Sequence, residues 1–302
     1  MKVLVLGSMG QVGSEIENSL NLRFGSSKIN IIKLTRKDLD LMHFEELKAT
    51  LFDLVPNVLI NAAAYTAVDS AEKENINANK LNGALPSLLG LICSELNIIL
   101  IHFSTDYVFN GLLARPYNEL DVVRPLGTYG MSKLDGEEGI RKHCDRYIIL
   151  RTAWVFGNNG NNFVKKMIEI GKNKTDIRVI SDQIGSPTSA KSIAITVSEI
   201  LFKMKDADKN DKRWGTYHYS GFPYISWAEF AEEIFEQAFQ KGIIDNMVTV
   251  HKINSLEFPT FVKRPKNSRL DCNKIEENFD IGPDNWKKSL GELLSSWGIT
   301  NA

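Results

Sequence analysis

The sequence predicts a doubly wound, parallel α/β sheet in its first half and a smaller lobe of mixed α/β structure after it. Short apolar strand patterns alternate with amphipathic helical patterns as far as Gly157, and the alternation loosens beyond that residue. Strands joined by helices pair in parallel, with right-handed crossovers. We therefore expect one domain over residues 1–157, joined by parts of 188–220, and a substrate lobe mainly from 158–302 that is interleaved with it.

The spacing of apolar residues and the positions of turn and capping residues predict the individual strands and helices. Runs rich in β-branched and apolar residues predict strands at residues 2–6, 30–34, 58–61, 99–103, 147–152, 176–181, 214–220 and 247–253. Apolar residues at helical spacing predict helices at 42–54, 79–96, 163–171 and 188–205, and a helix that begins at Tyr129. Ser226 and Glu229 form a capping box for a helix that ends near Gly242, and two helical patterns close the chain.

A glycine turn follows the first predicted strand. Gly7, Gly10 and Gly13 stand three residues apart, between a strand and a helical pattern. Gly7 permits the tight turn, Gly10 lets a pyrophosphate approach the backbone, and Gly13 allows close packing of helix and strand. The free N–H groups at the helix start would then face the phosphates. The spacing differs from the usual G-x-G-x-x-G, and the alternative is an ordinary turn.

The end of the second predicted strand bears on the choice of nicotinamide cofactor. Residues 35–37 read Thr-Arg-Lys, with no acid directly at the strand end. An arginine in this place suits the 2′-phosphate of NADPH, whereas an acid would hold the ribose hydroxyl of NADH. We expect NADPH, with NADH as the alternative because Asp38 and Asp40 lie close by.

Tyr129 and Lys133 are the candidate catalytic pair. Residues four apart on a helix share a face, so the phenol and the amine are expected to be neighbours. A phenol has a pKa of about 10, and an ammonium beside it would lower that value and ease proton exchange with a substrate oxygen. Thr105, at the end of the strand over 99–103, would fix that oxygen. The alternative is an exposed aromatic residue and a solvated amine.

The candidate residues follow strand ends and should therefore meet. Segments 7–13, 62–66, 104–106 and 153–157 each come directly after a predicted strand. Ligands of doubly wound sheets bind at the carboxyl ends of the strands. The small residues of segment 62–66 would let a cofactor lie against the backbone.

Composition argues against several classes of function. A net charge of −1 gives no basic field for nucleic acid or membrane, and 43% hydrophobic residues are ordinary for a globular protein. The three cysteines are far apart, which predicts reduced thiols and a cytoplasmic location, and the five histidines lack metal-ligand spacing. No signal peptide or membrane span is expected.

Taken together, these motifs resemble the extended short-chain dehydrogenase/reductase family, and within it the branch that reduces dTDP-4-keto-6-deoxy sugars. The matching segments are 7–13, 61–69 (Asn-Ala-Ala-Ala-Tyr-Thr-Ala-Val-Asp), 104–109 (Ser-Thr-Asp-Tyr-Val-Phe), 129–133, 151–155, 181–188 and 264–268 (Arg-Pro-Lys-Asn-Ser). They run in order along almost the whole chain. The resemblance implies a Rossmann-like fold.

By this resemblance, the reaction is the NADPH-dependent reduction of the C4 ketone of dTDP-4-dehydro-6-deoxy-L-mannose to dTDP-L-rhamnose. The implied catalytic residues are Thr105, Tyr129 and Lys133. The implied cofactor contacts are Gly7, Gly10, Gln11, Val12, Arg36, Asp40, Leu41, Ala62, Ala63, Ala64, Tyr65, Thr66, Ser104, Tyr129 and Lys133. The implied substrate contacts are Thr105, Asp106, Tyr129, Trp154 and Arg264, the last in a basic turn that could meet the diphosphate.

Some members of this family form a magnesium-linked dimer through glutamates. Glu15 fits one such position, but Lys191 stands where the partner acid belongs, and a lysine repels a hard cation. We therefore expect no metal site, and a monomer or a homodimer. The remaining alternatives are a reductase for another dTDP-4-keto-6-deoxy sugar, a nucleotide-sugar epimerase, and a non-catalytic subunit of the methionine adenosyltransferase regulatory type.

Overall fold

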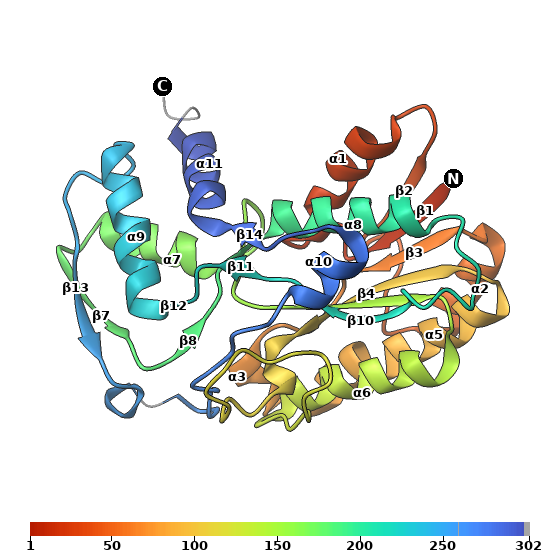
Figure 1. Cartoon of the computed structure of the whole chain (residues 1–302), viewed down its shortest axis with the longest axis horizontal. Helices are drawn as coiled ribbons and strands as arrows, with labels where there is room; N and C mark the ends of the chain where they lie inside the picture. The colour runs from red at the N-terminus through yellow and green to blue at the C-terminus, as the bar shows by residue number, and fades with distance from the viewer. Residues whose placement is uncertain (259, 299–302) are drawn as a thin grey trace.

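A computed structural model of the chain describes residues 1–258 and 260–298. Its centre is a six-stranded parallel sheet with the order β10-β5-β4-β3-β1-β2 (Figure 1). These strands are β1 (Lys2–Leu6), β2 (Asn30–Leu34), β3 (Val58–Asn61), β4 (Ile99–Thr105), β5 (Tyr147–Thr152) and β10 (Gly215–His218). The predicted doubly wound parallel sheet is confirmed.

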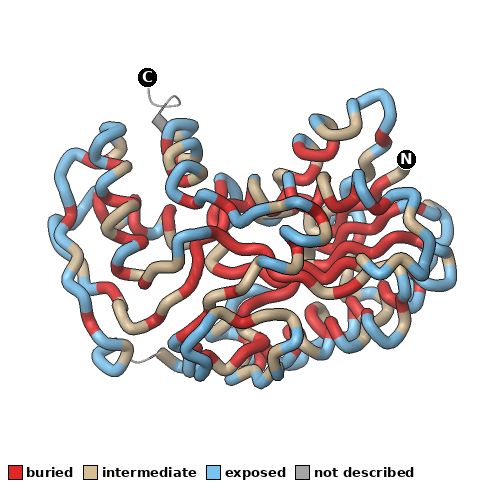
Figure 2. The backbone as a smooth tube through the Cα atoms, in the orientation of Figure 1, coloured by how far each residue is buried: buried red, intermediate tan, exposed pale blue. Residues whose placement is uncertain are grey.

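Helices cover both faces of this sheet. α1 (Gly13–Phe24) packs with α8 (Ala190–Met204) on one face, and α5 (Leu85–Glu95) packs with α6 (Thr128–His143) on the other (Figure 1). Successive strand residues point to opposite faces, so β4 contributes Ile99 and Ile101 to the core under α1 and α8, and Leu100 to the core under α5 and α6. The buried strands cross the middle of the molecule between these layers (Figure 2).

A second lobe lies beyond the sheet and has its own core. The helices α7 (Phe163–Gly171), α9 (Trp227–Gln240) and α11 (Trp286–Gly298) gather around the parallel pair β7 (Asp176–Ile180) and β13 (Thr249–Ile253) (Figure 1). Phe156, Phe230, Phe235 and Trp286 are the largest fully buried side chains of that core. The predicted capping box at Ser226 and Glu229 starts α9.

Short elements complete the chain. These are α2 (Phe44–Leu54), α3 (Val68–Ala71), α4 (Asn75–Asn79), the 3-10 turns η2 (Asp106–Val108) and η3 (Ser255–Glu257), α10 (Asn273–Phe279), and the two-residue strands β6 (Val155–Phe156), β8 (Ile184–Gly185), β9 (Thr188–Ser189), β11 (Gly221–Phe222), β12 (Ile225–Ser226) and β14 (Asp284–Asn285). α8 packs with α1 on the first sheet, and β10 pairs with β5 in it. The division near Gly157 stays a prediction, and residues 259 and 299–302 of the expected lobe lie outside the described residues.

One predicted helix is interrupted. The pattern over 79–96 folds as α4, then the π-helical segment η1 (Lys80–Ala84), then α5. Asn82 lies in η1, and its buried side chain pairs with both backbone polar groups of Tyr65, at 2.8 and 3.0 Å. The π segment thus holds the loop after β3 in place.

Candidate active site

A cavity of about 660 Å³ opens at the carboxyl ends of β1, β2 and β3. Nine of the predicted cofactor residues line it: Gly7, Gly10, Arg36, Asp40, Leu41, Ala62, Ala63, Ala64 and Tyr65. Sequence reasoning missed other wall residues, namely Ser8, Met9, Leu34, Thr35, Leu39, Met42, Glu74, Asn77 and Leu81. Most of these are ordinary apolar or polar residues without a motif, and only the folded chain brings them to one place.

In the glycine turn, backbone segments lie so close together that there is no room for a Cβ atom. Gly7 has φ +74°, and a Cβ there would lie 2.5 Å from the Ala63 nitrogen. A Cβ on Gly13 would lie 2.2 Å from the Gly7 carbonyl oxygen. The turn therefore brings β1, α1 and the loop after β3 into direct backbone contact, and the cavity opens beside them.

Arg36 is exposed at the mouth of this cavity, directly after β2. The neighbouring acid Asp38 is engaged with Thr35, because it accepts hydrogen bonds from the Thr35 backbone and hydroxyl at 2.8 and 2.6 Å. These bonds lower the pKa of Asp38. Asp40 accepts a hydrogen bond from the Met42 backbone at 3.0 Å. The Arg36 guanidinium makes no hydrogen bond or ion pair with another described residue, so it remains available at this strand end.

The remaining predicted cofactor residues lie outside the lining of this cavity. Gln11 accepts a hydrogen bond from the Asn162 amide at 3.1 Å, Val12 packs against the core under α1, and Thr66 is exposed before α3. The Ser104 hydroxyl donates to Glu137 at 2.5 Å, beneath α6. Their roles toward a cofactor stay predictions.

Thr105 and Asp106, which are buried, form a polar cluster with the half-buried Tyr129 where β4 ends. The Thr105 hydroxyl donates to Asp106 Oδ1 at 3.0 Å and accepts from the Tyr107 backbone at 3.1 Å. Tyr129 packs edge-on against the Tyr107 ring, at 5.6 Å between centroids. Burial raises the pKa of Tyr129 to about 12, while a hydrogen bond with Thr105 acts in the opposite direction.

Asp106 is a buried carboxyl group that is incompletely paired. Its Oδ2 has no hydrogen-bond partner of good geometry in the described part of the chain, although the Ser268 hydroxyl acts on it. Burial raises the pKa of Asp106 to about 7, against the lowering effects of Thr105 and Ser268. A group in this state can donate or accept a hydrogen bond near neutral pH.

Lys133 does not act on Tyr129 as predicted. Its amine donates to the Phe103 carbonyl at 2.6 Å and contacts His102 Nε2 at 3.2 Å. The pKa of Tyr129 is shifted by burial, by Thr105 and by Asp106, and Lys133 is not among these influences. The net change in the pKa is upward. The expectation that the ammonium lowers the phenol pKa is therefore wrong in this structure, because helical spacing fixes the face but not the direction of a long side chain. Burial lowers the pKa of Lys133 itself to about 8.

A second buried group, which sequence reasoning missed, anchors α6 to the sheet. The Glu137 carboxylate accepts two hydrogen bonds from Arg151, at 2.8 and 2.6 Å, and one each from Ser104 and Arg141. Burial alone would raise the pKa of Glu137, but the bonds from Arg151 outweigh it and lower the pKa. The signal in the sequence was the spacing of Tyr129, Lys133 and Glu137, which share one helix face.

Trp154 and Arg264, the remaining predicted substrate residues, lie on different segments. Trp154, with φ +45°, stacks on Trp227 with ring centroids 3.5 Å apart and covers Gly185. Arg264 pairs with Asp69 at 3.1 Å, while its Nε has no hydrogen-bond partner among the described residues. The basic turn therefore contacts α3, beside the loop of segment 62–66.

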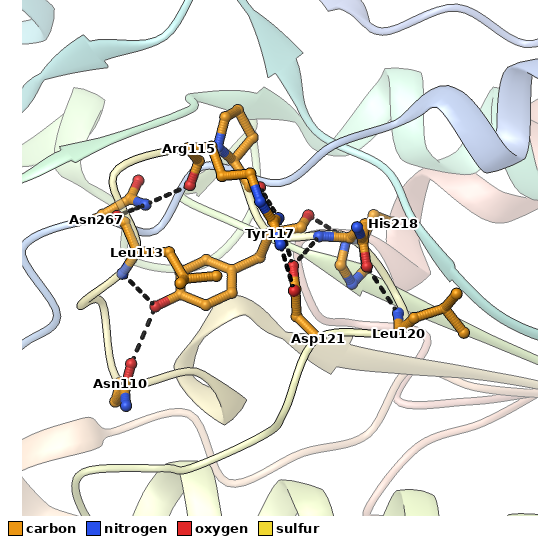
Figure 3. Close-up of polar contacts among 10 residues, drawn as sticks. Asn110, Leu113, Arg115, Tyr117, Leu120, Asp121, His218 and Asn267 are labelled. Carbon is orange, nitrogen blue, oxygen red and sulfur yellow. Dashed lines mark hydrogen bonds and ion pairs between the residues drawn. The ribbon is translucent and has the colours of Figure 1, made fainter.

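The segment between β4 and α6 is held by a polar network (Figure 3). The Tyr117 hydroxyl donates to Asn110 and accepts from the Leu113 backbone, and its carbonyl contacts His218 Nδ1 at 3.0 Å. Asn267 donates to the carbonyls of Leu113 and Arg115 at 2.7 and 2.8 Å. The basic turn, the β4–α6 segment and β10 are thereby joined around the polar cluster.

Lys191 lies in an ion pair with Glu292 at 3.0 Å, and no three potential ligands among His, Cys, Asp and Glu gather anywhere in the described ranges. Within those same ranges, no helix has both the length and the apolar character that crossing a bilayer requires.

Comparison with known proteins identifies the family. The family model described as the RmlD substrate binding domain matches residues 1–298. The chain belongs to this family. The resemblance predicted from the motifs is therefore confirmed.

Several known proteins match this chain over almost its whole length and almost the whole of their own. The dTDP-4-dehydrorhamnose reductase of Aggregatibacter actinomycetemcomitans is 37% identical over 97% of this chain and 98% of its own length. A crystal structure of a dTDP-4-dehydrorhamnose reductase from Clostridium acetobutylicum has a TM-score of 0.88 and 36% identity, covering 98% of this chain and 99% of that chain. The Bacillus anthracis structure, in complex with NADP, has a TM-score of 0.87 and 31% identity over the same shares.

Proposed function

We propose that the chain reduces the C4 ketone of dTDP-4-dehydro-6-deoxy-L-mannose to dTDP-L-rhamnose, with NADPH as cofactor and NADH as the alternative. The observation that carries the proposal is the placement of Tyr129 against Thr105 at the sheet edge where the glycine-lined cavity opens. Relatives that match over almost their whole length are named dTDP-4-dehydrorhamnose reductase.

The residues of the cavity suit a dinucleotide. Gly7 and Gly10 line the cavity directly before α1, so the N–H groups at the start of that helix can bind a pyrophosphate. Arg36 would bind the 2′-phosphate, and the small side chains of Ala62, Ala63 and Ala64 would let the cofactor lie close to the backbone. Bound NADPH would supply the hydride for the C4 carbon.

Tyr129 would supply the proton for the C4 oxygen. A pKa of about 12 keeps the phenol protonated at neutral pH, which is the form a proton donor requires. Thr105 would hold the same oxygen by a hydrogen bond, because its hydroxyl lies in the same cluster. After the transfer, the Tyr129 phenolate needs a cation, and Lys133 is the candidate on the same helix face.

Substrate recognition would fall to the groups around this cluster. The incompletely paired carboxyl of Asp106 can bind a sugar hydroxyl, and Trp154 offers a flat wall. Arg264, whose Nε lacks a partner among described residues, can bind the diphosphate if it exchanges its pairing with Asp69. We also place the protein in the cytoplasm as a monomer or homodimer, in keeping with its three free cysteines.

The decisive experiment is an assay with dTDP-4-dehydro-6-deoxy-L-mannose and NADPH. We expect loss of nicotinamide absorbance together with formation of dTDP-L-rhamnose, identified by mass and by NMR of the sugar ring. NADPH binding without turnover on this substrate would overturn the proposal and favour a regulatory subunit. Faster turnover of another dTDP-4-keto-6-deoxy sugar would assign the enzyme to that substrate instead.

A further inference from the structure

Three polar side chains form a buried row between the sheet and α6. Asn61 and His102 are direct partners across β3 and β4, and Lys133 reaches them from α6. The three residues are 1%, 1% and 2% exposed. A buried hydrogen-bonded row must match each donor with an acceptor, so its protonation states can be worked out from its geometry.

In the structure described, only one orientation of the Asn61 amide satisfies both of its neighbours. Its oxygen accepts a hydrogen bond from the Ala63 backbone N–H at 3.2 Å. Its NH₂ group therefore points the other way, toward His102 Nδ1 at 3.1 Å. Turning the amide over would place two donors against each other at Ala63. An NH₂ group only donates hydrogen bonds. His102 Nδ1 must therefore accept the hydrogen bond from Asn61, so this nitrogen carries no proton.

The proton of the neutral His102 ring is consequently on Nε2, which faces the Lys133 amine at 3.2 Å. An ammonium has only donors and would oppose this N–H. An uncharged amine can accept the Nε2 proton with its lone pair and still donate to the Phe103 carbonyl at 2.6 Å. Burial pushes the His102 pKa well below its usual value, which agrees with a neutral ring.

We propose that His102 is a positioning residue that holds Lys133 as an uncharged amine in the free protein, with its own tautomer set by Asn61. For Lys133 to become a cation, the Nε2 proton passes to the amine, Nδ1 takes one proton from solvent, and the Asn61 amide turns over. The charge that a Tyr129 phenolate needs is thereby coupled to this rearrangement. The inference rests on the proposed function for its catalytic meaning, but not for its geometry.

Other charged groups reach Lys133 from few directions. Glu137, on α6 itself, favours the charged form, and Arg151 of β5 is bound to that carboxylate. His102 is the titratable neighbour from β4, and Asn61 of β3 is uncharged. Asp106 acts on Tyr129 rather than on Lys133. The net effect of burial and Glu137 leaves the Lys133 pKa lowered.

The first test uses the free wild-type protein. Nitrogen-15 NMR of histidine side chains distinguishes the two neutral tautomers and the charged ring, and the His102 signal is assigned from its ring-to-backbone correlations. We expect the Nε2–H form at neutral pH. Detection of the Nδ1–H form or of a doubly protonated ring would overturn the inference, whatever the sugar assay shows.

The second test changes the hydrogen-bond donor to His102 Nδ1, which is Asn61, and leaves His102 and Lys133 unchanged. In Asn61→Asp the side chain keeps an oxygen for Ala63 and offers another to His102, which favours the Nδ1–H form. Asn61→Ala frees Nδ1 without adding charge. We expect both variants to raise the Lys133 titration midpoint, followed by NMR of the labelled lysine, by about one pH unit or more. A rise in Asn61→Asp alone would report only the added carboxylate and would overturn the inference, as would no rise in either.

Discussion

Two buried polar groups meet α6 from the sheet, and they are built on opposite principles. Around Glu137, every carboxylate oxygen is bound, by Arg151, Ser104 and Arg141. Around Tyr129, the Asp106 carboxyl retains an oxygen without a well-placed partner in the described structure. The two groups meet β4 at adjacent residues, because Ser104 bonds to Glu137 and Thr105 bonds to Asp106.

The difference indicates which group does chemistry. A buried ion pair whose oxygens all have partners has no place for a further ligand, and removing one partner is strongly destabilising. The Glu137 pair therefore fixes the position of α6 relative to β4 and β5. An incompletely paired group costs stability in the free protein and gains partners when a ligand arrives. We therefore propose that the Glu137 group anchors α6 and that the Tyr129 group binds the ligand.

The largest expected effect is on turnover at Tyr129. Tyr129→Phe removes the proton donor while keeping the ring, so we expect kcat to fall about 10²–10⁴-fold, the usual contribution of a positioned acid. Cofactor affinity, measured by fluorescence titration, should stay near that of the wild type. A variant with nearly normal kcat would remove the distinction drawn between the two groups.

The next largest effect is on stability at Glu137. Glu137→Gln leaves Arg151 buried without its charge partner, and we expect a loss of about 3–5 kcal/mol in the free energy of unfolding, measured with urea. The matched control is Arg178→Ala, which breaks the exposed pair with Glu257, where the side chains are 59% and 51% exposed. We expect about 0–1 kcal/mol there. Equal losses at the two sites would contradict the anchoring role.

Asp106 should instead oppose folding as the pH rises. Its pKa is about 7 in the folded protein, above the ordinary 3.8. The native state therefore binds more protons than the unfolded chain between these values, so this contribution to stability is complete below pH 3.8 and is lost as pH approaches 7. Asp106→Asn cannot ionise, and we expect it to gain roughly 1–3 kcal/mol on the wild type between pH 5 and pH 8. Urea unfolding at the two pH values checks this, and a gain that does not change with pH would contradict it.

The smallest effect is expected at the outer end of the cavity. Arg36→Ala removes the exposed guanidinium and should weaken NADPH binding by about 1–2 kcal/mol, roughly 5- to 30-fold, with little change for NADH. Lys37→Ala, one residue further along the same turn, is the control. Equal weakening of both cofactors would show that Arg36 does not read the 2′-phosphate.

Structure could be predicted from the sequence where the local backbone requires a particular type of residue. The glycine turn at 7–13 and the cap at Ser226 could be predicted because backbone geometry and capping demand those residues at those places. The strands of the sheet, apart from the order that places β10 at its edge, were readable as apolar runs.

The polar interior could not be predicted in the same way. Arg264 pairs with Asp69, 195 residues away, and nothing local to either residue indicates it. The direction of the Lys133 side chain depends on the carbonyl of Phe103 and the ring of His102, which belong to another element. The role of Glu137 depends on Arg151 of β5 in the same way. Such contacts depend on the fold, and they produce no periodic pattern in the sequence from which they could be predicted.

The edge position of β10 has a consequence for synthesis on the ribosome. This strand begins at Gly215 of 302 residues, yet it completes the sheet that starts at Lys2, by pairing with β5. Because domains emerge from the N-terminus, the nascent sheet exposes the unpaired edge of β5 until the intervening α7–α8 region has been made. We expect this protein to finish its nucleotide-binding half late in translation, with the exposed β5 edge open to chaperones until then.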